Sequence, residues 1–395
     1  MSGFKREEFE VFGKKIFFNW ASFSPAPSSA VKKVKEMADS VHYFSDNDVS
    51  ALWEQQSGEL RKEASRLLNA DADEIVCAGS STTQGLQIAM NCINPSRGEN
   101  IVTDSIEFPT AGFEGARWKK RGVEQRIAQC GDGKVEAERF DRLIDEHTSA
   151  VLISSVNWLN GYRADLKEIA KITHESGGYL VVDAVQQMGA GNIDVRKNDV
   201  DFVAAGGQKW MFSPFGSAVL FVNQRNFDRL AVPYPSLNNT KKPEKGWPAY
   251  FADESNDPFE EREAVGTAKR FEYGGWMNHT GIAAHAVSLQ LLNELNINNV
   301  EKRIYQLYEY ASEKIEGIGG KIISPSEKTE RSSILTFRLK DNWREHFEIV
   351  AKLATRGFAL SCRGAGGIGG IRMSIHCFNE EEDVDKLIPE LKRFI

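Results

Sequence analysis

Features that would place this chain on a membrane or a nucleic acid are missing from its sequence. It has no apolar run of about 18 residues, the length at which a helix spans a bilayer. Residues 1–15 are charged and lack the apolar core of a secretory signal. The formal net charge is −7, so a basic excess is also absent, and we expect neither nucleic acid nor an anionic membrane as a partner.

Cysteine is scarce and dispersed. The chain has five cysteines in 395 residues, and none of their spacings is typical of a metal site or of a disulfide framework. We therefore expect reduced thiols, no metal site and a cytoplasmic location. The five are Cys77, Cys92, Cys130, Cys362 and Cys377.

Between residues 75 and 222, short apolar runs alternate with amphipathic stretches. This rhythm predicts an α/β fold with a mostly parallel sheet that helices cover on both faces. In such sheets, ligands bind at the carboxyl ends of the strands. We expect strands at 74–79, 100–103, 150–155, 179–183, 201–205 and 217–222, and helices at 83–93, 137–146 and 166–176.

The rhythm stops at residues 233–278, which are rich in proline and charge and are typical of a long functional or mobile connection. A second, smaller α+β domain is expected beyond it. We place the large domain at 16–275 and the small domain at 280–395, with residues 1–15 packing on the small domain. The expected small-domain helices are 283–295, 301–316 and 343–356, and its strands are 333–339 and 370–375.

Two residues at the ends of apolar runs suggest a chemistry. Asp183 ends the run 179–183, and Lys209 follows the run 201–205 and two glycines. Taken alone, such an aspartate usually caps a helix and such a lysine usually reaches solvent. Together they fit pyridoxal phosphate, because the lysine would hold the aldehyde as a Schiff base and the carboxylate would keep the ring nitrogen protonated.

A phosphate-binding site is expected where a strand leads into a helix. Residues 77–86 provide a strand end, a small flexible turn rich in Ser and Thr, and a helix start. The backbone N–H groups of a helix N-terminus attract a dianion, although the same segment also fits a plain Ser/Thr helix cap.

An ordered set of motifs resembles the class V aminotransferases, the group that includes cysteine desulfurases and relatives of isopenicillin N epimerase. Each motif is weak alone, but all occur in the family's order across residues 16–390. The motifs are Thr82-Thr83, Glu107-Phe108-Pro109, Asn157, Asp183 to Gln186, Gln208-Lys209, Arg270 to Gly274 and Arg372 to His376.

The resemblance implies a fold-type-I homodimer that binds pyridoxal 5′-phosphate at the subunit interface and acts on an amino acid as its small-molecule substrate. Lys209 would carry the cofactor, and Asp183 would bind its ring nitrogen. The other implied cofactor contacts are Thr82 and Thr83 at the phosphate, Phe108 on the ring, Asn157 and Gln186 beside the phenolate oxygen, and Gln208 and Gly275. The implied substrate contacts are Arg372 at the α-carboxylate and the loop Asn19, Trp20 and Ala21.

This chain also departs from the family pattern. Gln208 replaces the family's histidine, Gly206 its serine, and Gly275 the threonine that reaches the partner subunit's phosphate, so phosphate-binding hydroxyls are lost. Desulfurases carry a nucleophilic cysteine several residues after the arginine that matches Arg363. Here that stretch is short, glycine-rich and free of cysteine, and we expect Cys362 to end a strand, so a persulfide-forming desulfurase is not expected.

The resemblance, and the family members that lack the desulfurase cysteine, imply aminotransferase-like chemistry in which Lys209 would shuttle the α-proton. β-Elimination, as in a C–S lyase, and epimerisation share the first steps and stay open. Two alternatives of other kinds are a nucleotide- or sugar-binding module without a covalent cofactor and a fold-type-I protein that has lost catalysis. An aromatic substrate pocket, or interface packing, is expected from Trp20, Trp247, Tyr250, Phe251 and Trp276.

Overall fold

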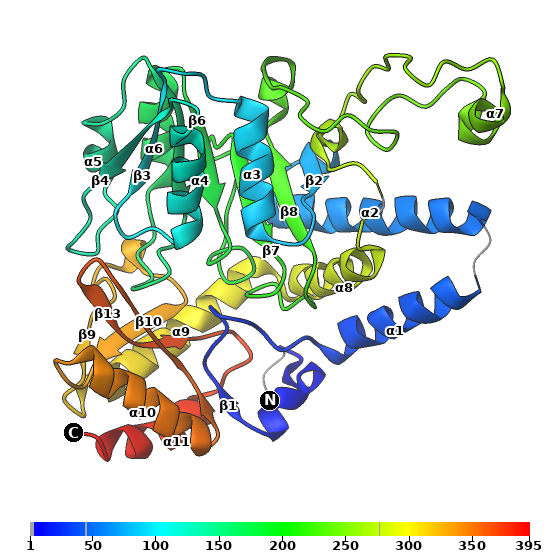
Figure 1. The fold of residues 1–395 in the computed structure, drawn as a ribbon. Helices are drawn as coiled ribbons and strands as arrows, with labels where there is room; N and C mark the ends of the chain where they lie inside the picture. Colours follow the sequence, from blue (N-terminus) through cyan, green and yellow to red (C-terminus); the bar gives the residue numbers. More distant parts are fainter. Residues whose placement is uncertain (1–3, 44–45, 276) are drawn as a thin grey trace.

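The structure is a computed structural model that describes residues 4–43, 46–275 and 277–395. Its larger sheet has seven strands, and all neighbours are parallel except β8, which runs antiparallel to both β2 and β7. The predicted α/β fold is therefore confirmed (Figure 1). In spatial order the strands are β2 (Ile75–Cys77), β8 (Ala218–Val222), β7 (Phe202–Gly206), β6 (Tyr179–Asp183), β5 (Thr148–Ser154), β3 (Asn100–Asp104) and β4 (Glu124–Ala128).

Successive residues of the central strands pack into two separate hydrophobic cores, one on each face of this sheet. On β6, Leu180 and Val182 face one core and Val181 faces the other, as the two-residue period of a strand requires. Helices α3 (Thr82–Ile93) and α4 (Pro109–Lys119) contribute to the core that holds Val181. The opposite core is completed by α2 (Asp46–Leu68), α5 (Ala137–Asp141), α6 (Leu166–Glu175) and α8 (His279–Leu295).

A four-stranded antiparallel sheet forms the second body, with a core of its own. Its order is β12 (Ser361–Ala365), β13 (Ile368–Ser374), β10 (Ile334–Arg338) and β9 (Lys321–Ile322), and it packs with α9 (Ile297–Glu316), α10 (Trp343–Thr355) and α11 (Glu381–Lys392). The N-terminal segment lies against this body, where Arg6 Nη1 pairs with Asp383 at 2.9 Å and β1 (Ile16–Phe17) pairs with β11 (Phe358–Ala359). Helix α1 (Ser28–His42) packs on α8.

The connection at 233–278 is only partly a surface segment. Its short helix α7 (Gly246–Ala252) lies away from the two sheets (Figure 1), as expected for a connection. Ala268 and Phe271, however, are fully buried in the large-sheet core. A single 3-10 turn, Ala268–Phe271, therefore anchors this connection to the core. None of the described helices is long and apolar enough to cross a membrane.

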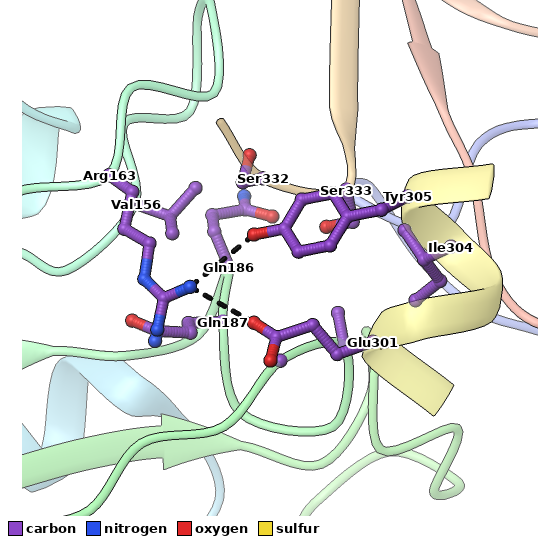
Figure 2. Close-up of a pocket in the computed structure, with 11 residues that line it drawn as sticks. Val156, Arg163, Gln186, Gln187, Glu301, Ile304, Tyr305, Ser332 and Ser333 are labelled. Carbon is purple, nitrogen blue, oxygen red and sulfur yellow. Dashed lines mark hydrogen bonds and ion pairs between the residues drawn. The ribbon is translucent and has the colours of Figure 1, made fainter. Parts of the chain in front are cut away.

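A polar contact joins the two bodies beneath the site. Arg163 Nη1 donates to Glu301 Oε1 at 3.0 Å and to the Tyr305 hydroxyl at 3.3 Å, and both acceptors lie on α9 (Figure 2). The enclosed space beside them is about 10 Å³, which suits one water molecule and no substrate. The contact therefore links the large domain to α9, and the space beside it is too small for a substrate.

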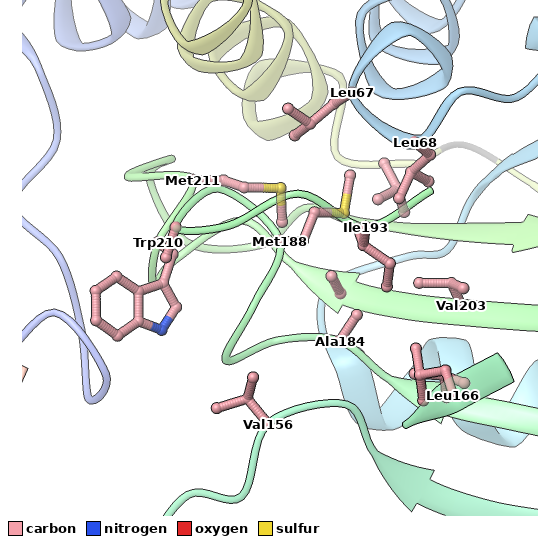
Figure 3. Close-up of a cluster of buried hydrophobic side chains, with 14 of the residues drawn as sticks. Leu67, Leu68, Val156, Leu166, Ala184, Met188, Ile193, Val203, Trp210 and Met211 are labelled. Carbon is pink, nitrogen blue, oxygen red and sulfur yellow. The ribbon is translucent and has the colours of Figure 1, made fainter. Parts of the chain in front are cut away.

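Buried neighbours fix the segment that carries Lys209. Trp210 and Met211, which directly follow the lysine, are 0% and 1% exposed and pack in the same core as Met188 and Ile193 (Figure 3). Truncating such buried side chains lowers the free energy of unfolding by about 2–5 kcal/mol. Their packing therefore holds the backbone next to Lys209 in place.

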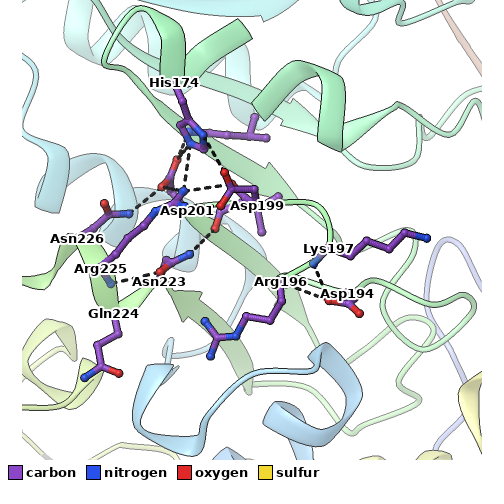
Figure 4. Close-up of polar contacts among 12 residues, drawn as sticks. His174, Asp194, Arg196, Lys197, Asp199, Asp201, Asn223, Gln224, Arg225 and Asn226 are labelled. Atoms are coloured by element: carbon purple, nitrogen blue, oxygen red, sulfur yellow. Dashed lines mark hydrogen bonds and ion pairs between the residues drawn. The ribbon is translucent and has the colours of Figure 1, made fainter. Parts of the chain in front are cut away.

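The opposite end of the strand that leads to Lys209 is fixed by a buried carboxylate. Asp201 accepts from Leu180 N, His174 Nε2, Arg225 Nη2 and Asn226 Nδ2, each at 2.8 Å (Figure 4). Burial opposes its ionisation, but the hydrogen bond from His174 and the other donors outweigh burial and lower the pKa of Asp201. The hydrogen bond to Asp201 in turn raises the pKa of His174.

We expect Asp201→Asn to lower the free energy of unfolding by about 3 kcal/mol, because it leaves buried donors without their charged acceptor. The His174 contribution is complete below its ordinary pKa of 6.5 and is lost as the pH rises through the raised value. Urea unfolding at pH 6 and pH 9 measures both effects. An unfolding free energy equal to that of the wild type would contradict this role for Asp201.

Candidate active site

A cavity of about 250 Å³ lies at the carboxyl ends of the central strands. Each contributing element brings one part of it: β6 ends in Asp183, the segment after β7 brings Lys209, and β13 brings Arg372. Its lining is Ala21, Ser22, Phe23, Ser81, Thr82, Thr83, Phe108, Thr110, Trp158, Asp183, Val185, Gln186, Gln208, Lys209, Arg363 and Arg372. The structure therefore brings most of the predicted site residues together.

Lys209 and Asp183 lie within each other's electrostatic field in this cavity. Burial lowers the pKa of Lys209 to about 8, against the opposing charge of Asp183 and with a smaller contribution from Arg372. Burial also raises the pKa of Asp183, while the Val185 N–H, which donates to Asp183 Oδ1 at 2.9 Å, and the lysine charge oppose that shift. The amine is thus far closer to its nucleophilic neutral form than a surface lysine.

This environment predicts a pH profile for the amine. In the cofactor-free protein, competitive labelling with acetic anhydride should acylate Lys209 along a titration curve that levels off above about pH 8. Ordinary solvent-exposed lysines should continue to gain reactivity up to about pH 10.4. Peptide mass spectrometry reads both in one sample. A Lys209 curve that coincides with the surface lysines would contradict the burial of this amine.

The start of α3 offers donors to a phosphate. The helix begins at Thr82 after the N-cap Ser81, whose hydroxyl accepts from Gln84 N at 3.3 Å. The N–H groups of Thr82 and Thr83 have no acceptor among the described residues, as is usual in a first helical turn. This end of α3 faces the cavity through Ser81, Thr82 and Thr83, so it suits an anion there.

The glycine at the family's serine position has a steric cause. Gly206 N donates to Thr82 Oγ1 at 2.9 Å, and a Cβ on Gly206 would lie 2.4 Å from Gln208 Oε1. Gln208 therefore fills the space that a serine side chain would need. Its Oε1 is buried without a hydrogen-bond partner among the described residues. Because an amide oxygen only accepts, it is the Nε2 group of Gln208 that could donate to a phosphate in place of the missing hydroxyls.

Phe108 lies over the amine side of the cavity. Its ring centroid is 5.5 Å from Lys209 Nζ, and Trp158 packs edge-on against it at 5.4 Å. The preceding Glu107 accepts from the backbone N–H and the hydroxyl of Ser154, the residue that pairs with Asp183 across β5 and β6. Burial, together with the carboxylates of Asp104 and Asp183, raises the pKa of Glu107. The hydrogen bonds between Glu107 and Ser154 thus hold the Phe108 segment against β5, next to Asp183 on β6.

Two residues that were expected beside the phenolate oxygen, Asn157 and Gln186, are hydrogen-bonded within the protein. Asn157 Nδ2 donates to Ile106 O at 3.1 Å and its Oδ1 accepts from Leu159 N at 2.9 Å, so it shapes the turn below the site. Gln186 lines the cavity, but its amide joins Ala21 O at 3.2 Å to the Trp210 indole at 2.9 Å. These hydrogen bonds tie the N-terminal loop to the segment that carries Lys209.

Trp20 and Gly275 do not line this cavity. The Trp20 side chain is fully buried and its indole N–H donates to Asn379 Oδ1 at 3.1 Å, so it supports the loop from below. Gly275 lines a different cavity, with Trp53, Trp247 and Phe251. Tyr250 packs on Trp247 and Phe251 in that same segment, and Trp276 lies outside the described residues.

The substrate end of the cavity has a network that sequence reasoning only partly identified. Arg372 Nε donates to Ser361 Oγ at 3.1 Å, Nη1 to Trp158 O at 2.7 Å and Nη2 to Ser22 Oγ at 2.9 Å. Asn19 accepts from the Ser22 hydroxyl at 2.8 Å and so acts through it. Trp158 and Arg363 were not predicted as site residues, although Arg363 is the arginine of the desulfurase comparison. Ser22 is the last residue of the predicted loop 19–22, and its link to the arginines was not predicted.

The cavity fits pyridoxal phosphate on structural grounds. A buried carboxylate for the ring nitrogen, an amine of lowered pKa, free donors at a helix start and an aromatic wall surround one space. Asp183, Lys209, α3 and Phe108 would hold the ring nitrogen, the aldehyde, the phosphate and the ring face respectively.

Comparisons with known proteins agree. The family model "Aminotransferase class-V" matches residues 16–387. An uncharacterized aminotransferase of Schizosaccharomyces pombe is 27% identical over 388 residues, which cover 95% of this chain and 91% of that protein. A probable cysteine desulfurase of Methanothermobacter thermautotrophicus is 23% identical over 97% of this chain and 95% of its own length.

Solved structures show the same fold. The apo cysteine desulfurase of Thermococcus onnurineus NA1 has a TM-score of 0.84 at 19% identity and covers 98% of this chain and 96% of that one. A cystine C–S lyase in complex with cysteine persulfide has a TM-score of 0.85 at 20% identity, over 97% of this chain and 99% of that one. The chain therefore belongs to the class V aminotransferase family, and the predicted cofactor of this enzyme, pyridoxal 5′-phosphate, is confirmed with it.

Proposed function

We propose that this enzyme carries out aminotransferase-like chemistry on α-amino acids. When bound, pyridoxal phosphate draws electrons away from the bonds of the substrate α-carbon. The observation that favours transamination is the lining itself: among the described residues, its ionisable side chains are Lys209, Asp183 and the two guanidinium groups of Arg363 and Arg372. With Asp183 held to the ring nitrogen, Lys209 is left as the single proton carrier.

The other residues position the substrate. Arg372 presents N–H groups to an α-carboxylate, and its three existing hydrogen bonds hold the guanidinium in place. Ala21 and Gln186 close the cavity from the side of the N-terminal loop, which excludes water from the reacting atoms. A substrate carboxylate on Arg372 therefore places the α-carbon between the arginine and Lys209.

Epimerisation and elimination have less support from this lining. Removal and return of a proton on opposite faces calls for two acid–base groups, and a poor leaving group calls for an acid beside it. Neither a histidine, a cysteine nor a tyrosine lines the described cavity. The hairpin that follows Arg363 is a two-residue turn, Gly366-Gly367, with positive φ at both positions, and it holds no cysteine loop. Cys362 lies on β12, and burial raises its pKa.

Product analysis tests the proposal. The purified holoenzyme is incubated with single amino acids and a keto acid acceptor, and keto acid, ammonia and sulfide are measured. Transamination predicts a new keto acid and a new amino acid in equal amounts without free ammonia. Release of ammonia and pyruvate without an acceptor would establish elimination in its place, and inversion of the α-carbon alone would establish epimerisation.

We further propose that the enzyme is a homodimer in the cytoplasm. Gly275 lines a cavity of about 950 Å³ that Lys209 does not line. In the same connection, the side chains of Phe251 and Phe259 are 65% and 88% exposed. A second copy of the chain that binds at this cavity would cover both phenylalanines. It would also bring Gly275 of the first copy close to the active site of the second. All five cysteines are free thiols, in keeping with a reducing compartment. Light scattering at the monomer mass would contradict the dimer.

A further inference from the structure

A phenylalanine lies between the two ends of the active-site cavity. Phe23 lines the cavity, and each of its chain neighbours is tied to one end. On one side, Arg372 Nη2 donates to Ser22 Oγ at 2.9 Å. On the other side, Ser24 N donates at 2.9 Å to Gln208 O, one residue before the active-site lysine. Phe23 is therefore held between the arginine that suits an α-carboxylate and the amine that reacts.

The Phe23 side chain is exposed although it is large and apolar. It is 58% exposed, and its ring packs edge-on against Phe215, which is 69% exposed, with the ring centroids 5.5 Å apart. Phe215 lies between Lys209 and β8. Both rings thus belong to segments next to the active-site lysine. An exposed apolar pair that borders a cavity is the kind of surface at which ligands bind.

The cavity has an aromatic side, but the tryptophans expected to form it are not part of it. Trp20 supports the loop from below, and Trp247 lines a different cavity. The aromatic side chains of the described lining are Phe23, Phe108 and Trp158. Phe108 is assigned to the cofactor ring, and Trp158 packs edge-on against it at 5.4 Å. Phe23 is thus the aromatic ring left to contact the side chain of a substrate.

The charged groups of the lining are already assigned or lie at the carboxylate end. Lys209 and Asp183 are assigned to the cofactor. Arg363 Nη2 donates to Ser22 Oγ at 3.0 Å, the same atom that accepts from Arg372 Nη2, so both guanidinium groups meet at this end. Between Ser22 and Gln208 the loop therefore presents an apolar ring and not a charge.

Building on the proposed function, we propose that the substrate is an α-amino acid with an aromatic side chain and that Phe23 selects it. With the α-carboxylate on Arg372, the α-carbon lies beside Phe23, so a side chain that extends from this carbon packs on the Phe23 ring. Two aromatic rings gain from edge-on or offset contact in addition to burial, which favours a phenyl or indole group over an aliphatic one. Phe215 touches Phe23 and does not line the cavity, so it is a positioning residue.

Binding of non-reacting acids measures this selection without any turnover. Calorimetric titration of the holoenzyme compares 3-phenylpropionate with propionate, which lacks the phenyl ring. Wild-type protein should bind 3-phenylpropionate about 10- to 100-fold more tightly, as expected when one ring is removed from water. Phe23→Ala should reduce this preference to about threefold or less and leave propionate affinity unchanged. Phe23→Tyr keeps a ring at this position and should keep most of the preference.

Two further variants separate selection by Phe23 from a general effect on the fold. Phe215→Ala should lower the preference less than Phe23→Ala does. Phe347→Ala, at an exposed phenylalanine of α10 outside this cavity, is the matched control and should change neither affinity.

Equal affinity of the wild type for the two acids would overturn the proposal, as would equal weakening of both acids in Phe23→Ala. Unchanged binding in Phe23→Ala together with an altered oligomeric state would assign the ring pair to a subunit contact in its place. Turnover enters none of these titrations. If the preference for 3-phenylpropionate holds but no amino acid yields a keto acid, the proposed function fails and the aromatic selection stands.

Discussion

Replacing Lys209 with alanine is expected to lower turnover by about 10⁴-fold or more, because it removes both the nucleophilic amine and the only proton carrier of the described lining. The fold should persist, since the Lys209 side chain makes no hydrogen bond with the described residues and its backbone is fixed by buried Trp210 and Met211. Removing a buried amine of lowered pKa costs the folded state little.

Turnover and folding must be measured on the same Lys209→Ala preparation. Stopped-flow absorbance with the best substrate gives the rate, and urea unfolding gives the stability. Lys167→Ala, at an exposed lysine of α6, is the matched control and should retain full activity. An Lys209→Ala protein that keeps a tenth of the wild-type turnover would show that another group performs the proton transfer.

Asp183→Asn is expected to have the second largest effect, a loss of about 10²–10³-fold in turnover. Asparagine is nearly isosteric and can still accept the Val185 N–H at the position of Oδ1. It cannot supply the negative charge that keeps a ring nitrogen protonated, and removing one partner of a buried ion pair costs about 3–5 kcal/mol, each 1.36 kcal/mol being tenfold in rate.

Asp183→Glu is the informative companion to Asp183→Asn, because it keeps the charge and moves it by one methylene. It should recover part of the lost rate, whereas a purely structural role for Asp183 would make the bulkier glutamate the worse of the two. Measuring kcat together with the dissociation constant of the cofactor separates loss of binding from loss of chemistry. Wild-type values of both in Asp183→Asn would contradict the assigned role.

The sequence was sufficient for the parts of the fold that rest on local pattern. The apolar runs at 179–183 and 201–205 became β6 and β7, and their ends meet because neighbouring parallel strands share a carboxyl edge. Strand β4 was missed because four of its five residues are not buried and its sequence is polar. Helix α4, which begins at Pro109, was also missed, since one proline, one threonine and two glycines weaken its helical pattern.

The site was predictable only where a motif carried it. Lys209, Asp183, Thr82 and Phe108 stand at motif positions, and the structure places them around one cavity. Arg363 and Ser22 were not predicted as partners, because their hydrogen bond joins positions 341 residues apart in the chain. Trp20 was expected to contact substrate, but its indole donates a hydrogen bond to Asn379 and packs on Phe378. Local sequence pattern does not predict contacts between residues so far apart in the chain.

The most direct test of the central claim is the position at which the cofactor attaches. The protein is incubated with pyridoxal 5′-phosphate, reduced with borohydride, digested, and mapped by peptide mass spectrometry. The structure predicts one stoichiometric adduct on Lys209, in the segment that follows β7. An adduct spread over surface lysines, or none on the peptide that contains Lys209, would contradict the account.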